Sequence, residues 1–306
     1  MLQSIINLLY RYPKAQVKKL RRFGGLFNYY LMMKGQKQMK SSSLKLKPVI
    51  SHPQGLPIYF LTGKKYLHQT LFCIQSLTKA TSKPFRFVLV DDGTFDVKLI
   101  EHINRLLPGV KVIDTSTINK NLEEKLPKAT FKQLHQKRAV YPHIKKLTDI
   151  HTITEDPWKL VLDSDMLFWN EPTKIINWLM DPDTPLHMVD CEQSYGYSIP
   201  LMESLCCTAV KPLVNVGAIG LNSNHINWHN IQHWVKLLEE KEGTSYYLEQ
   251  AITAMLIGDA NTVELDSSQY IVAPDKTTIK QKNGILHHYV DLSKEGYYKT
   301  AWESLI

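Results

Sequence analysis

The chain has 306 residues, of which 43% are hydrophobic and 22% are charged, as in a globular protein of one large domain or two small ones. Its 14 Gly and 15 Pro exclude fibrous and low-complexity proteins, and its four cysteines, without a C-x-x-C spacing, exclude a disulfide framework. No apolar run approaches the roughly 20 residues of a membrane span. The first residues lack the features of a signal peptide, so we expect a cytoplasmic location, free or peripheral on the inner face of the membrane.

The net charge of +8 is spread unevenly, because residues 1–90 carry 16 Lys and Arg and no acidic residue. We interpret residues 1–48 as a basic amphipathic helical extension, with a linker over 34–48, and residues 49–306 as the main domain. The extension begins with a short apolar face over residues 2–9. Basic residues interleaved with apolar ones favour an anionic membrane surface, and a helical flap packed on the domain explains them equally well. Nucleic-acid binding is not expected, since no recognised module follows.

Short apolar strands alternate with amphipathic helices from residue 57 onward. The predicted strands are Ile58–Thr62, Phe85–Val90, Val110–Ile113, Lys159–Leu162, Leu186–Asp190, Gly217–Leu221, Thr262–Leu265 and Gly284–His287. The predicted helices run over 67–78, 99–107, 131–141, 228–242 and 246–257. This β-α-β order predicts an α/β fold with a mostly parallel sheet and helices on both faces.

Two aspartates, Asp163 and Asp165, follow an apolar strand in the stretch KLVLDSDMLFW. Ligands of open parallel sheets bind at the carboxyl ends of the strands, where these side chains are expected. Carboxylates at positions i and i+2 suit one Mn²⁺ or Mg²⁺ ion shared with substrate phosphates. The alternative is a turn with two solvated acids.

A strand that ends in D-x-D after a basic helix resembles the nucleotide-sugar-dependent glycosyltransferases of the GT-A fold. The stretches IYFLTGKKYLHQTLFCIQSL, FVLVDDGT, LVNVGAIGLNS and YYLEQAITAML resemble further segments of these enzymes in the same order. The stretch LHHYVDLSKEG resembles the C-terminal H-x-x-G-x-x-K motif of the retaining family 8 enzymes, the glycogenin and bacterial galactosyltransferase type. His288 and Lys294 match the His and Lys of that motif, whereas Asp291 stands where the motif has Gly.

The resemblance implies a metal site of Asp163, Asp165 and His288, with Lys294 at the donor diphosphate. His287, beside the proposed ligand, is expected to be a packed or capping histidine. The nucleoside would lie at the junction of the first strand and helix, which holds the donor-binding candidates Thr62, Gly63 and Tyr66.

Two further pairs of residues are candidates for the donor site. Asp91 and Asp92 would contact the base or ribose, with a plain strand-terminating turn as the alternative. Lys137 and Arg138, on the helix before the D-x-D, are candidates for the phosphates, with a solvated basic helix face as the alternative.

The remaining candidates are catalytic. In a family 8 enzyme, Gln250 would face the sugar and Glu249 would position the donor or the acceptor, although the helix dipole alone also favours an acid at this helix start. Asn215 would hydrogen-bond the sugar or the acceptor. Gly217 is instead a donor-binding candidate, which would let the backbone approach closely or would mark a strand bulge.

We therefore expect a metal-dependent hexosyltransferase that uses a nucleotide sugar, with UDP-hexose as the donor class and a glycan or lipid-linked glycan as the acceptor. Retention of configuration follows from the C-terminal motif alone. The alternatives are an inverting GT-A enzyme with Glu249 as the base, a HAD-type phosphatase, since LDSDML loosely fits D-x-D-x-[TV], and an inactive GT-A protein that binds a sugar or a partner.

Overall fold

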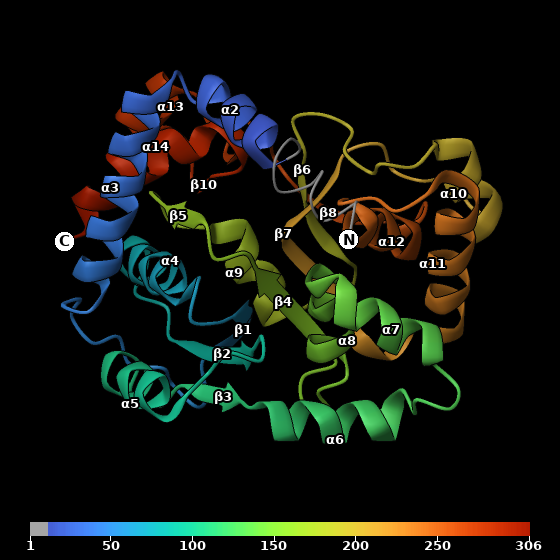
Figure 1. The fold of residues 1–306 in the computed structure, drawn as a ribbon. Coiled ribbons are helices and arrows are strands. Elements are labelled where there is room, and N and C mark those ends of the chain that lie inside the picture. The colour runs from blue at the N-terminus through green and yellow to red at the C-terminus, as the bar shows by residue number, and fades with distance from the viewer. Residues whose placement is uncertain (1–11) are drawn as a thin grey trace.

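The computed structural model describes residues 12–306, which form a seven-stranded sheet flanked by helices and a second, three-stranded sheet (Figure 1). The strands are β1 (Leu56–Thr62), β2 (Phe85–Asp91), β3 (Lys111–Ile113), β4 (Trp158–Leu162), β5 (Met166–Phe168), β6 (Leu186–Val189), β7 (Val214–Asn222), β8 (Val263–Leu265), β9 (Tyr270–Val272) and β10 (Leu286–His288). The helices before β4 are α2 (Tyr12–Arg22), α3 (Leu26–Ser43), α4 (Leu67–Ala80), α5 (Val97–Leu106), α6 (Thr115–Lys125), α7 (Lys132–Val140) and α8 (Lys145–His151). The later helices are α9 (Thr173–Met180), α10 (Ile199–Cys206), α11 (Trp228–Glu242), α12 (Leu248–Ile257), α13 (Lys276–Gln281) and α14 (Lys294–Lys299).

The large sheet has the strand order β3-β2-β1-β4-β7-β6-β8, and only β7 runs antiparallel to its neighbours. Alternate residues of a strand face opposite sides of a sheet. In β1, Ile58 and Phe60 accordingly join the core under α4 and α9, whereas Tyr59 joins the core under α8 and α12. The predicted α/β class, with a mostly parallel sheet and helices on both faces, is confirmed.

Each predicted strand is present, with ends that differ by no more than a few residues. The sequence prediction did not include β5 and β9, which are three residues long and carry too little periodicity to be recognised. These two strands flank β10 in the small sheet, whose order is β5-β10-β9. The small sheet matters for the site, because β5 begins directly after the D-x-D stretch.

The N-terminal helices correct one prediction, since residues 34–43 belong to α3 and are not a linker. The buried face of α3 carries Met32, Gly35 and Met39, and it packs against α14 and α4. A side chain at Gly35 would overlap the carbonyl oxygen of Tyr298, so glycine permits this close helix contact. The apolar face expected at residues 2–9 lies outside the described residues. Among helices in the described part of the chain, none is long and apolar enough to cross a membrane.

Candidate active site

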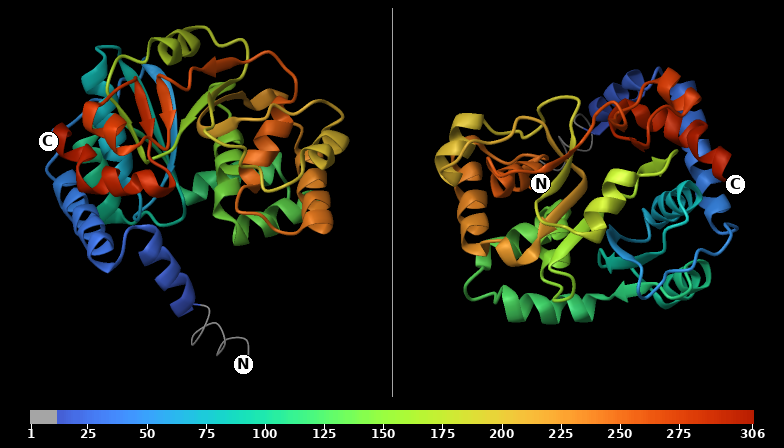
Figure 2. Two further views of the ribbon diagram at one scale, coloured as in Figure 1. Left: turned by 90° about the horizontal axis from the view of Figure 1, so that it is seen from above. Right: turned by 180° about the vertical axis from the view of Figure 1, so that it is seen from behind.

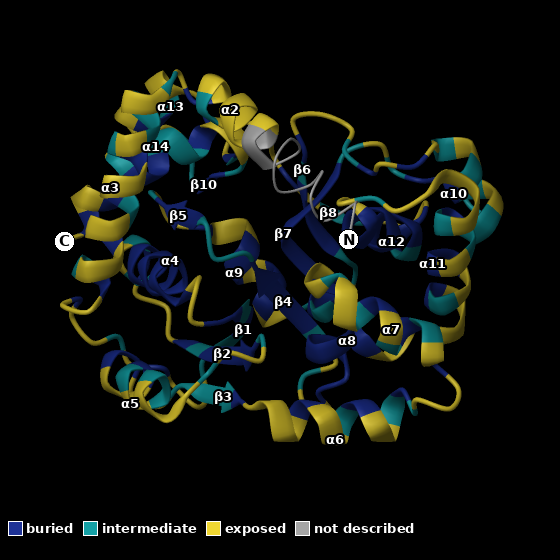
Figure 3. Cartoon of the chain, in the orientation of Figure 1, coloured by how far each residue is buried: buried dark blue, intermediate teal, exposed yellow. Residues whose placement is uncertain are grey.

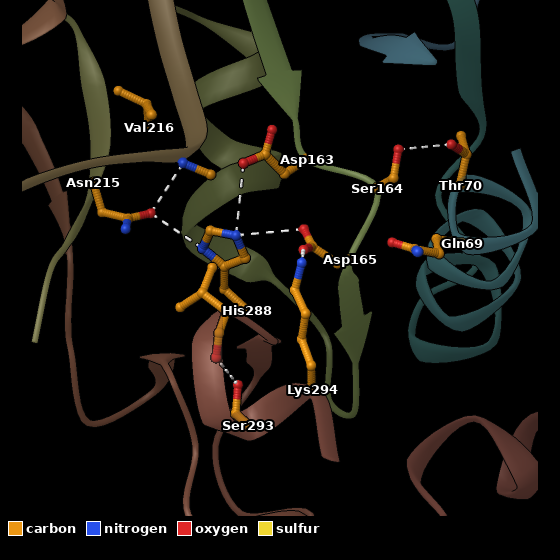
Figure 4. Close-up of polar contacts among 12 residues, drawn as sticks. Gln69, Thr70, Asp163, Ser164, Asp165, Asn215, Val216, His288, Ser293 and Lys294 are labelled. Carbon is orange, nitrogen blue, oxygen red and sulfur yellow. Dashed lines mark hydrogen bonds and ion pairs between the residues drawn. The ribbon is translucent and has the colours of Figure 1, made fainter. Parts of the chain in front are cut away.

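Three side chains from two distant segments converge at the carboxyl edge of the large sheet (Figure 4). Asp163 follows β4, and its backbone N–H continues the ladder to the carbonyl of Gly217 in β7 at 2.7 Å. His288 ends β10, which pairs antiparallel with β5, and the N–H of Tyr289 donates to the carbonyl of Asp165 at 2.9 Å. This pairing brings Nε2 of His288 to 3.6 Å from Asp163 and 3.5 Å from Asp165. The structure therefore brings the predicted metal ligands together.

The orientation of the His288 ring follows from a hydrogen-bond relay behind it. Asn215 donates from Nδ2 to Asp190 at 3.1 Å, and its Oδ1 accepts from the N–H of Gly217 at 2.9 Å. Oδ1 of Asn215 must face Gly217, because a flipped amide would set its NH₂ donor against the N–H donor of Gly217. The same Oδ1 therefore accepts from Nδ1 of His288 at 3.2 Å. The proton then sits on Nδ1, and the Nε2 lone pair points at the two carboxylates.

The chemistry of this donor set fits a divalent cation. Nε2 of His288 is buried and has no hydrogen-bond partner among the described residues. An unpartnered buried nitrogen facing two carboxylates is costly unless a ligand satisfies it. The side chain of Asp163 is 30% exposed, so the cluster opens to solvent on one side. Two carboxylates and one imidazole suit Mn²⁺ or Mg²⁺, with the nitrogen favouring Mn²⁺.

Gly217 makes room for His288. A Cβ at this position would overlap the imidazole and lie 2.6 Å from Cε of Met166. The structure also bears out the alternative of a bulge at Gly217, because His187 and Met188 of β6 pair with Ile219 and Asn215, which leaves residues 216–218 of β7 unpaired on that side. Asn215, expected at the sugar or acceptor, is instead bonded to Asp190, Gly217 and His288.

Two lysines hold the carboxylates. Lys294 lies 3.1 Å from Asp165, and Lys146 of α8 lies 2.9 Å from Asp163 and 3.6 Å from Glu249 while donating to the carbonyl of Val216. Burial would raise the pKa of Asp165, but the neighbouring Lys294 ammonium outweighs it and holds that pKa well below its usual range. Burial also disfavours the charged form of Lys146, but its carboxylate neighbours outweigh this and raise its pKa. Both lysines are therefore cations at neutral pH.

The two candidate catalytic residues at the start of α12 have different surroundings. Glu249 is buried, which raises the pKa of its carboxyl to about 7 even though Lys146 lowers it. Gln250 is also buried and donates from Nε2 to Asp190 at 2.9 Å. Asp190 therefore links Gln250 with Asn215, and through Asn215 with His288.

The donor-binding candidates near the first strand lie beside the D-x-D. Thr62 ends β1 and bonds Thr70 of α4 at 2.8 Å, and Thr70 bonds Ser164 at 2.8 Å. Gly63 lies under the carboxylate of Asp92, where any side chain would overlap it. Tyr66, at the start of α4, is 40% exposed.

The side chain of Asp91 stabilises the turn that follows β2. Its Oδ1 accepts from the N–H groups of Gly93, Thr94 and Phe95, and its Oδ2 accepts from Thr115. These bonds match the strand-terminating turn that the sequence left open as the alternative.

Lys137 and Arg138 are not in the cluster, which corrects their proposed role at the phosphates. Lys137 is ion-paired with Glu239 of α11, and Arg138 makes a bidentate pair with Asp149 at 2.6 and 2.7 Å. Both side chains therefore hold α7 to its neighbours.

His287 is packed as predicted: Trp169 donates to its Nδ1 at 2.9 Å, and its Nε2 contacts the carbonyl of Asn283.

Sequence reasoning missed Lys146, Asp190 and Ser164. No local signal separated Lys146 from its neighbour Lys145, because the surrounding segment mixes polar and apolar side chains. Asp190 ends an apolar strand just as Asp163 does, so the rule applied to the D-x-D would have found it.

Solved structures share this architecture. The chain is similar to the galactosyltransferase LgtC, crystallised with donor and acceptor sugar analogues, with a TM-score of 0.52 and 15% identity over 81% of this chain and 95% of that chain. The chain has the GT-A fold. The bifunctional glycosyltransferase WbbM gives a TM-score of 0.52 at 12% identity over 85% of this chain and 52% of that chain. Mouse xyloside xylosyltransferase 1 gives 0.51 at 13% identity over 79% and 98%. No protein-family model and no curated protein matches the sequence.

Proposed function

We propose that this GT-A protein is a metal-dependent hexosyltransferase that uses a nucleotide sugar, of the UDP-hexose class, and a glycan or lipid-linked glycan acceptor. The observation that carries the proposal is the convergence of Asp163, Asp165 and the unpartnered Nε2 of His288. Asp165 and His288 are 123 residues apart in the sequence, and the β5-β10 pairing brings them together. A fold that only needed a solvated turn here would not bury an imidazole nitrogen against two carboxylates.

The chain's own residues divide the work of donor binding. Asp163, Asp165 and His288 would hold the cation, which supplies positive charge to the leaving diphosphate when bound. Lys294 lies on the same segment as His288 and would bind a phosphate oxygen as a point charge. Lys146 of α8 holds the carboxylates of Asp163 and Glu249 in place through its two ion pairs. Thr62, Gly63, Tyr66 and Asp92 line the neighbouring strand ends, where we place the nucleoside.

We propose retention of configuration, because the C-terminal segment takes the place that its resemblance to family 8 enzymes implies. The inverting alternative has one observation in its favour: a pKa of about 7 suits Glu249 to general-base work. Against it, the carboxyl side chain is only 8% exposed and shares Lys146 with Asp163. The anomeric configuration of the product, read by NMR before mutarotation, decides between the two.

The test is release of UDP from UDP-hexoses with and without Mn²⁺. The wild type should release UDP only with the metal, and Asp165→Asn should lose this activity. Asp259→Asn, an exposed acid remote from D-x-D in sequence, is the matched control and should behave as wild type. Hydrolysis of an aryl phosphate in place of UDP release would favour the phosphatase alternative, and binding of UDP-hexose without turnover would favour the inactive sugar-binding protein.

A further inference from the structure

The outer face of α3 carries a row of large apolar side chains that face solvent. Leu26, Phe27 and Tyr30 are 72%, 74% and 61% exposed, and Met33 is 39% exposed. Their spacing places them on one side of the helix, opposite the buried face that packs on α14. The burial map shows the same division along α3 (Figure 3). Exposed apolar side chains in a contiguous row mark an interaction surface.

The charged residues of α2 and α3 themselves are all basic, and one of them, Arg22, pairs with Asp291 of the segment before α14. Residues 12–43 contain eight Lys and Arg and no Asp or Glu. Lys18 and Arg21 of α2 and Lys34 and Lys37 of α3 are exposed. Viewed from above, α2 projects away from the body of the molecule, so its basic side chains are accessible (Figure 2).

We infer that α2 and α3 form a docking surface for an anionic lipid bilayer. An apolar face that can enter the headgroup boundary, bordered by lysine and arginine, is the pattern of a helix that lies in the membrane interface. Nucleic acid would use the positive charge and leave Leu26, Phe27 and Met33 exposed. The sequence allowed either a membrane-binding helix or a flap packed on the domain. On our inference α3 does both, because its inner face packs on the domain and its outer face binds the bilayer.

This surface is connected to the candidate active site through α14. Lys299 of α14 donates to Asn28 of α3 at 2.5 Å, and Gly35 packs against the backbone of Tyr298. Lys294 begins the same helix. A docked α3 would therefore hold the phosphate-binding segment near the bilayer surface, as a lipid-linked acceptor requires. Docking itself does not depend on the proposed transferase activity, and its test measures binding alone.

The test is flotation of the full-length protein with vesicles of phosphatidylcholine alone or mixed with phosphatidylglycerol, in low and high salt. The wild type should float only with the anionic vesicles, and increasing salt should weaken the binding. The charge variant Lys18→Glu, Arg21→Glu, Lys34→Glu should lose at least 100-fold in affinity, because each basic residue near the surface contributes about a fivefold factor. Its matched control is Lys98→Glu, Lys128→Glu, Lys241→Glu, which reverses three exposed lysines elsewhere.

The apolar variant Leu26→Ser, Phe27→Ser, Tyr30→Ser should weaken vesicle binding while leaving the thermal unfolding midpoint unchanged, because these side chains are already exposed. Its control, Val97→Ser, Val140→Ser, removes equally exposed apolar side chains and should bind as wild type. Binding to a nucleic-acid duplex but not to vesicles would overturn the inference. So would a dimer in light scattering that the apolar variant disperses while vesicles remain unbound.

Discussion

The substitution Gly217→Ala should remove metal binding through a single methyl group. The added Cβ would overlap Cε1 and Nδ1 of His288 and lie 2.6 Å from Cε of Met166, so the imidazole must move. Metal ligands tolerate displacements of only about 0.2 Å. We therefore expect Mn²⁺ affinity to fall about 100-fold, as for loss of a residue that orients a ligand. Overpacking should also cost about 1–3 kcal/mol of unfolding free energy.

The assay is thermal or urea unfolding with and without Mn²⁺, together with direct titration of the metal. At a Mn²⁺ concentration of 100 times the wild-type Kd, binding stabilises the wild type by about 2.7 kcal/mol and a variant with 100-fold weaker binding by only about 0.4 kcal/mol. Gly220→Ala, on the same strand as Gly217, is the matched control, because its added Cβ would overlap the ring of Trp178 on α9. It should lose stability and keep its metal response. Mn²⁺ binding by Gly217→Ala within threefold of wild type would show that His288 is not a ligand.

The other predictions concern the charged groups of the site. Asp165→Asn should abolish both Mn²⁺ binding and metal-dependent UDP release while the fold survives, as followed by titration and circular dichroism. Lys146→Met should cost about 3–5 kcal/mol, because it leaves the buried carboxyl of Glu249 and the partly exposed carboxylate of Asp163 without their shared cation, and should also impair UDP release. Lys137→Met should lose stability through its pair with Glu239 and keep UDP release. For Glu249, the pKa of about 7 in the fold lies above the ordinary carboxyl value of 4.5, so its contribution to stability is fully present below pH 4.5 and is lost as the pH rises through 7.

The controls separate these effects from general damage. For Glu249, the difference in unfolding free energy between wild type and Glu249→Gln, measured in urea from pH 4 to 8, should change by about 3 kcal/mol across this window. A flat difference would mean that the carboxyl titrates normally. Equal loss of UDP release in Lys146→Met and Lys137→Met would contradict the assignment of Lys146 to the site and of Lys137 to the scaffold.

Sequence patterns predicted the parts of this molecule that depend on local chemistry. Short apolar runs located β1, β2 and β4, and the strand-end rule located Asp163 and Asp165. The resemblance at the C-terminus proposed His288. Phosphate contacts were assigned to Lys137 and Arg138, and Lys146 was overlooked, because charge alone cannot show which of two successive basic helices faces the sheet edge. Lys137 is held away from the site by Glu239, which comes from a distant segment, and Arg138 is held by Asp149 on the next α-helix.

The N-terminal segment was misread for a related reason. Residues 34–48 are polar and basic, which resembles a linker, but Met39 is fully buried and Gly35 touches the backbone of α14. A single apolar residue every three or four positions is enough to dock a helix when its partner supplies a matching surface. That surface is made by residues near 298, and no local pattern in α3 reveals it.

The balance of charge in the site shows why donor and cation belong together in the proposed function. Asp163, Asp165 and Glu249 oppose Lys146 and Lys294, and the pKa of Glu249 near 7 leaves the cluster between neutral and one negative charge at neutral pH. Such a cluster has no net attraction for a diphosphate that arrives alone. A divalent cation on Asp163, Asp165 and His288 would turn the same cluster positive and leave Lys294 free to face the phosphate. The two lysines thus allow the carboxylates to be held together in the fold without a cation, and they leave enough negative charge for a cation to bind with the donor.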